Sequence, residues 1–155
     1  MSRPLARVLL LLLAAMTLGI AAPACGGDGE SDEEKAAEES RSEAFAPICE
    51  MTAMSGDTGL PAGFPVPGEV TWVKSEKAGP STIVEGYAED DMSDLYDEWH
   101  EQFESSDYKI TFDEKEEHDA EISFEGGGQS GQVKLADECG ESGRVYARVT
   151  IRPTG

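Results

Sequence analysis

Three cysteines, Cys25, Cys49 and Cys139, are the side chains of this 155-residue chain best suited to covalent chemistry, because a thiolate is a strong nucleophile and metal ligand. Cys25 ends a leader with the features of an export signal: two arginines, an uncharged apolar run over residues 8–22, and small residues just before the thiol. That run is shorter than the roughly 20 apolar residues that a membrane-spanning helix needs. The leader therefore predicts export rather than a permanent membrane span.

Residues 1 to about 30, and Ala22-Pro23-Ala24-Cys25 in particular, resemble the signal peptides of bacterial lipoproteins. In that family a diacylglyceryl group, with fatty acids such as palmitate, is attached to the cysteine thiol, and cleavage makes this cysteine the first residue. The resemblance implies a protein held at the cell membrane or outer envelope by a lipid on Cys25, facing outside the cytoplasm. It departs from the family pattern at Ala22, where leucine is common. The same small residues also fit ordinary signal cleavage, which would release a soluble exported protein with an unmodified Cys25.

The segment after Cys25 has the composition of a solvated tether. Residues 26–34 contain no apolar side chain, and repulsion between their acidic groups favours an extended linker. We therefore expect three parts: a signal peptide over 1–24, the lipidated cysteine with an acidic disordered linker over 25–44, and a single folded domain over 45–155.

Cys49 and Cys139 remain as an even pair if Cys25 carries the lipid. In an oxidising compartment such pairs are usually bridged, so we expect a disulfide between them. A zinc site would need closely spaced Cys and His ligands, and neither His100 nor His118 has that spacing to either cysteine. The sequence predicts no metal site and no cofactor.

The formal net charge of −20 excludes nucleic acid as a natural partner, because binding a phosphate backbone depends on clustered lysines and arginines. Anionic lipid headgroups are disfavoured for the same reason. Two explanations of the charge stay open. The acidic side chains either keep an exported domain soluble and monomeric, or steer a basic protein, a polycation or a metal ion towards it.

Two loops have the composition of ligand-binding loops without their other features. Gly126–Gly131 joins two strand patterns and holds no basic residue, whereas a phosphate-binding loop leads into a helix. Asp113–Glu121 is crowded with carboxylates but lacks the glycine turn and fixed acidic offsets of a calcium loop. We expect both to be solvated hairpin turns, and Glu89–Asp91 to cap a helix.

Catalysis has little support in the sequence. His100 and His118 are the only histidines, and neither accompanies a recognisable nucleophile motif. A domain of this size offers little room for the sugar cleft that a carboxylate pair would serve in a glycosidase. We therefore predict no catalytic residues and no enzymatic activity.

One amphipathic helix and six strands are expected to carry these residues. Met92, Leu95, Tyr96, Trp99 and Phe103 form a single helical stripe, with Asp91 as the N-cap. Strand patterns precede and follow it, at Val70–Lys74, Ser81–Ala88, 108–112, 120–124, 133–135 and 145–151, with a turn over Lys77–Pro80. Each strand alternates polar and apolar residues, which is typical of an antiparallel sheet with one buried face. The sequence predicts an α+β fold in the order ββαββββ, with the helix packed on one face of the sheet.

The expected core combines the helix stripe with residues of the strands, namely Trp72 or Val73, Phe112, Phe124, Val145 and Val149. Upstream, the spacing of Phe45, Ile48, Met51 and Met54 predicts a short docked helix or turn. In the proline-rich connector that follows, Phe64 and Val66 are expected to fill the edge of the core.

The folded part resembles small exported α+β lipoproteins of high-GC bacteria in its arrangement: a proline-rich lead-in, a hairpin, one aromatic-rich helix and a terminal run of strands. The resemblance brings no binding or catalytic residues with it. The expected function is that of a membrane-anchored, non-catalytic module of the cell envelope that binds an envelope protein or a small ligand. The alternative is a divalent cation or small-solute binder that uses the acidic turns.

Overall fold

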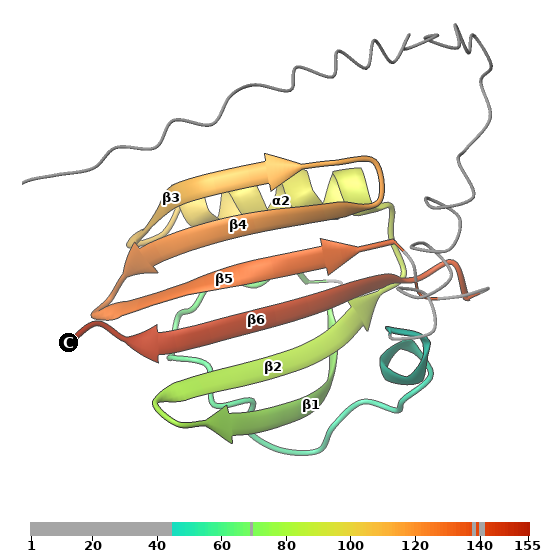
Figure 1. Ribbon diagram of the computed structural model, residues 1–155, viewed down its shortest axis with the longest axis horizontal. Coiled ribbons are helices and arrows are strands. Elements are labelled where there is room, and N and C mark those ends of the chain that lie inside the picture. Colours follow the sequence, from blue (N-terminus) through green and yellow to red (C-terminus); the bar gives the residue numbers. More distant parts are fainter. Residues whose placement is uncertain (1–44, 69, 138, 140–141) are drawn as a thin grey trace, which may run out of the picture.

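The computed structural model describes residues 45–68, 70–137, 139 and 142–155 (Figure 1). These form a mixed α+β fold dominated by one six-stranded antiparallel sheet. Its elements are β1 (Thr71–Ala78), β2 (Ser81–Ala88), α2 (Met92–Glu104), β3 (Tyr108–Lys115), β4 (Asp119–Gly126), β5 (Gln129–Ala136) and β6 (Val145–Pro153). The signal peptide expected over 1–24, and the lipidated Cys25 and linker expected over 25–44, lie outside the described residues.

From β1 onward the elements follow the expected order. The short docked helix or turn expected upstream is a helix over residues 45–49, which the order ββαββββ did not include. The strand order in the sheet is β1-β2-β6-β5-β4-β3. After the β1–β2 hairpin, α2 carries the chain to the far edge, and the β3–β6 meander brings β6 back beside β2 (Figure 1). The first and last strands of the chain therefore lie only two places apart.

Helix α2 begins and packs as its sequence pattern predicts. The Asp91 carboxylate accepts a hydrogen bond from the backbone N–H of Ser93 at 2.8 Å, which satisfies one of the free donors of the first turn. The five stripe residues are all buried. They pack on β3, β4 and β5, and Figure 1 shows the helix behind β3 and β4.

The prediction that Phe112 belongs to the core is wrong. A register shift between Ile110 and Phe112 places Phe112 opposite Ser123, and its side chain is 53% exposed. The cause is a β-bulge, which inserts an extra residue and turns the following side chains to the other face. Tyr108 and Ile110, before the shift, still pack on the helix side.

Strand β1 is longer than expected, because its turn is tighter than expected. The turn is confined to Gly79 and Pro80, with Gly79 at φ +60°, which suits the first central position of a two-residue hairpin loop.

A second register shift, in β1, separates Trp72 from Lys74. Trp72 packs on the helix side, as alternation requires, while Val73 is the extra residue of the shift and is buried on the opposite face, the face that also carries Lys74.

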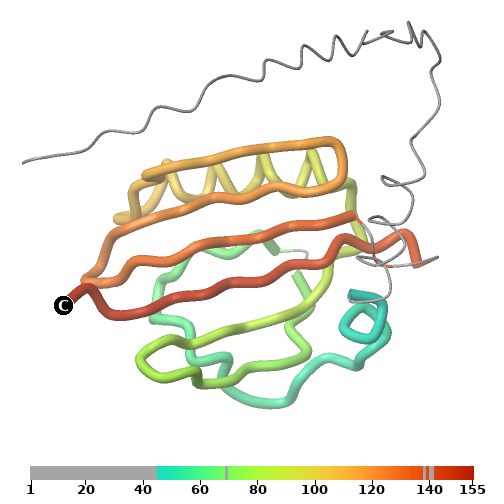
Figure 2. Tube along the Cα trace, in the orientation of Figure 1, coloured from blue at the N-terminus to red at the C-terminus, as the bar shows by residue number. Residues whose placement is uncertain are grey.

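The proline-rich connector covers the part of the sheet that α2 leaves open. Phe64 contacts four aromatic rings at centroid distances of 5.2–6.2 Å, those of Trp99, Phe103, Tyr108 and Phe124. It is thus part of the main core rather than its edge. Figure 2 shows this segment passing the β1 side of the sheet and running behind it.

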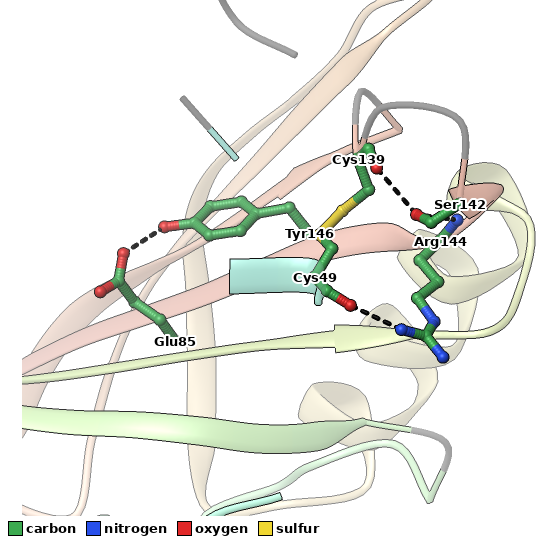
Figure 3. Close-up of a disulfide and its surroundings, with 6 residues drawn as sticks. All are labelled: Cys49, Glu85, Cys139, Ser142, Arg144 and Tyr146. Atoms are coloured by element: carbon green, nitrogen blue, oxygen red, sulfur yellow. Dashed lines mark hydrogen bonds between the residues drawn. A yellow bond between two sulfur atoms is a disulfide. The ribbon is translucent and has the colours of Figure 1, made fainter. Parts of the chain in front are cut away.

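A second, smaller core lies on the other face of the sheet, under the helix of residues 45–49. Cys49 and Cys139 form a disulfide there, with Cα atoms 5.8 Å apart (Figure 3). The ring of Phe45 stacks on that of Tyr146 with centroids 4.3 Å apart. Ile48 packs on the same cluster, whereas Met51 is 40% exposed, so the docking stripe is shorter than predicted.

Candidate binding face

The face of the sheet opposite α2, here called the open face, is the candidate functional surface. Figure 1 looks onto it, with the helix of residues 45–49 covering one end. Each strand contributes one charged residue to a row that crosses this face from edge to edge. In the order of the strands, this charged row is Lys74, Glu85, Arg148, Lys134, Glu121 and Glu114.

Glu85 is the most buried carboxylate of the charged row and is held by two donors. The Tyr146 hydroxyl donates to its Oε1 at 2.7 Å, and the Lys74 ammonium donates to its Oε2 at 2.9 Å (Figure 3 shows the tyrosine bond). Burial acts to raise the pKa of the Glu85 carboxyl, but these bonds outweigh it and hold the pKa below its ordinary value of 4.5. Glu85 is therefore a carboxylate at neutral pH.

On the other side of the row, Glu121 also has two partners. The Lys134 ammonium lies 3.6 Å from its Oε1, and the Gln132 side-chain amide donates to its Oε2 at 3.0 Å. Glu121 therefore fixes the position of Lys134 on β5. The lysine is only partly exposed, at 33% of its side-chain surface.

The centre of the charged row is different, because two cations face each other there. Lys134 and Arg148 are directly opposite on β5 and β6, an arrangement that is unfavourable for like charges. The Nε–H of Arg148 is buried and has no hydrogen-bond partner among the described residues. A buried donor left unpaired costs about 1–3 kcal/mol. The centre of the open face thus holds two like charges side by side and one buried donor, the Arg148 Nε–H, without a partner among the described residues.

A groove of about 500 Å³ lies over this centre. Among the described residues, three basic side chains contribute to its lining and Glu125 is the only acidic one. The remaining lining is mainly hydroxyl and amide groups. The lining residues are Ser81, Thr111, Phe124, Glu125, Ser130, Gly131, Gln132, Lys134, Arg148, Thr150 and Arg152. Such a groove can bind an anionic or hydroxylated molecule by charge-assisted hydrogen bonds.

The glycine-rich and acidic segments singled out in the sequence occupy hairpin turns. Gly127 and Gly128 form the β4–β5 turn, both with positive φ. The acidic segment spans the β3–β4 hairpin, where the Glu116 N–H donates to the Asp119 carbonyl at 2.8 Å. Within the described ranges, no three His, Cys, Asp or Glu side chains come close enough to hold a metal ion.

The two histidines lie apart and have different carboxylate neighbours. His100 is 3.4 Å from Asp113, which also accepts a hydrogen bond from the Tyr96 hydroxyl at 2.7 Å. Burial and this bond raise the pKa of Tyr96 to about 12, so the phenol remains protonated at neutral pH. The Nδ1 atom of His118, in the β3–β4 turn, is 3.3 Å from the carboxylate of Asp137, which directly follows β5.

Sequence reasoning missed the groove residues. Their signal is present as the polar half of two alternating strands, Ser130, Gln132 and Lys134 on β5 and Arg148, Thr150 and Arg152 on β6. This alternation places three residues on one face of each strand. It does not reveal that β5 and β6 are neighbours, which depends on the topology of the whole sheet.

No helix of the described part is long and apolar enough to cross a membrane. The chain matches no known family model, no curated protein and no solved structure.

Proposed function

We propose that this protein is an exported, membrane-anchored, non-catalytic module of the bacterial cell envelope that binds a ligand or an envelope protein through the open face. The export leader and the cysteine that follows it support the location. The observation that carries the binding role is the groove over Lys134 and Arg148, where two cations lie side by side and the buried Nε–H of Arg148 has no partner among the described residues.

The anchor is tested by replacing Cys25 with Ser. We expect the wild-type protein in the membrane fraction, with an N-terminal peptide that carries the mass of a diacylglyceryl group, and the variant in the soluble fraction. Replacing Ser31 with Ala in the linker is the matched control and leaves fractionation unchanged. Membrane retention of the Cys25→Ser variant, or a wild-type peptide without acyl mass, contradicts the anchor.

The binding face is tested by photo-crosslinking in intact cells. A photoreactive residue at Thr111, which is exposed at the groove, is compared with one at Glu98, which is exposed on the outer side of α2. We expect a discrete crosslinked product from the Thr111 position only. A product from Glu98 alone would place the contact surface on the helix instead.

The cation-binding alternative is tested by calorimetry with CaCl₂. We expect no heat of binding and no change in melting temperature. A saturable signal with Ca²⁺ would favour the alternative over the open-face proposal.

A further inference from the structure

The groove on the open face has the opposite charge to the chain as a whole. Residues 45–155 contain eight lysines and arginines, and three of them, Lys134, Arg148 and Arg152, line this one groove. The chain carries a formal charge of −20, yet the groove lining includes a single acid, Glu125. A concave surface with an excess of one sign raises the local concentration of ions of the opposite sign. The groove is therefore a place where this acidic molecule attracts an anion.

Each of the two central cations has an acidic residue on its outer side. Glu121 lies 3.6 Å from the Lys134 ammonium on one side of the pair. On the other side, Arg148 lies opposite Glu85 and lowers the pKa of that carboxyl together with Tyr146 and Lys74. Both acids also accept hydrogen bonds from other donors. Glu121 accepts one from Gln132, and Glu85 accepts one each from Tyr146 and Lys74. The acids thus offset part of the charge of the two cations, while their oxygens also accept hydrogen bonds from these other neighbours.

Building on the proposed function, we propose that the groove binds an oxyanion group of its ligand, a carboxylate or a phosphate, between Lys134 and Arg148. An anion there would separate two like charges that now face each other across β5 and β6. The planar guanidinium of arginine offers paired donors that match the geometry of carboxylate and phosphate oxygens, while lysine adds a point charge. The hydroxyl groups of Ser130 and Thr150 lie on the same lining and can donate to further oxygens of the ligand.

The experiment measures the melting temperature of the purified protein in sodium phosphate, in sodium glucuronate and in sodium chloride at equal ionic strength. Phosphate and glucuronate are the probes for the two oxyanion sources. We expect at least one of them to raise the melting temperature in a saturable way beyond the effect of chloride, because a ligand that binds only the folded state stabilises it. The probe that does so identifies whether the groove prefers a phosphate or a carboxylate.

Variants locate the binding. Lys134→Gln keeps a polar side chain beside Glu121, and we expect it to weaken binding of the active probe about tenfold or more. Lys77→Gln removes one exposed lysine at the end of β1, outside the groove, and is the matched control with an unchanged affinity. Arg152→Gln, at an exposed groove position, provides a second variant that leaves the charged row intact.

Two results would overturn the inference: no stabilisation by either oxyanion beyond that of chloride, or an equal loss of affinity in Lys134→Gln and Lys77→Gln. Neither result would affect the broader proposal if the Thr111 position still gives a crosslinked product in cells. Conversely, absence of that product together with saturable oxyanion binding would leave the site in place and refute only the open-face contact in the envelope.

Discussion

Glu85 shows how one buried acid can organise a polar sheet face. Its side chain is only 14% exposed, yet it is stable as a carboxylate because Tyr146 and Lys74 donate to its two oxygens. Burying a charge is unfavourable unless it is paired and hydrogen-bonded. Glu85 meets both conditions, and it lies opposite Arg148 on the neighbouring strand.

This arrangement predicts how stability depends on pH. Because the folded-state pKa of Glu85 is lower than its unfolded value near 4.5, its contribution is complete above that value and is lost as the pH falls through the folded-state pKa. We expect Glu85→Gln to lower the free energy of unfolding by about 1–3 kcal/mol at pH 7. Urea unfolding at pH 7 and at pH 3 measures both effects, and the difference between wild type and variant shrinks at pH 3.

The control for this prediction is Glu76→Gln. Glu76 pairs with the same lysine at 3.2 Å, but its side chain is 48% exposed. Exposed ion pairs contribute little, about 0–1 kcal/mol. If Glu76→Gln destabilises the protein as much as Glu85→Gln, the burial argument for Glu85 is wrong.

The elements show which features the sequence could predict. The buried stripe of α2 and its Asp91 cap were predicted correctly, because both are local signals. The side of β3 on which Phe112 lies was predicted wrongly, because a bulge leaves no mark on a strict alternation of residues. The candidate groove could not be predicted at all, since it depends on β6 pairing with both β2 and β5.

The bulge in β3 leads to a prediction about two phenylalanines. Phe112→Ser removes a half-exposed ring, and we expect it to change the free energy of unfolding by less than about 0.5 kcal/mol. Phe124→Ser removes a ring that is 1% exposed and contacts Phe64, Phe103 and Tyr108, and we expect a loss of at least about 3 kcal/mol. Thermal and urea unfolding of the two variants compares the positions. Similar losses at both would mean that Phe112 lies in the core after all.

At the scale of the whole molecule, the disulfide joins the start of the described chain to the segment between β5 and β6. Non-covalent contacts of Arg144 support the same region. Its guanidinium donates to the Cys49 carbonyl at 2.6 Å (Figure 3) and to the Glu89 carboxylate at 2.8 Å. The guanidinium also lies over the Tyr87 ring. The bridge spans a sequence separation of 90 residues. Closing a loop of that size restricts the unfolded chain, and measured bridges typically stabilise by about 2–4 kcal/mol.

We therefore expect Cys139→Ser to lower the free energy of unfolding by about 2–4 kcal/mol relative to the oxidised wild type. Cys49→Ser and the double variant are expected to lose a similar amount, because all three remove the same bond. Urea unfolding with and without reductant measures this, and reductant affects the wild type alone. A double variant with twice the loss of the single ones would show that the two thiols act independently.

The position of the bridge has a mechanical consequence. A pull applied at the N-terminal end, as from an anchored tether, reaches Cys49 and passes through the sulfur atoms to Cys139, and from there to β6 and the C-terminus. The strands β1–β5 and helix α2 lie within the covalently closed loop, outside this path of force. Stretching the oxidised protein end to end would therefore extend only the short segments outside the loop, whereas the reduced protein could be drawn out along its full length.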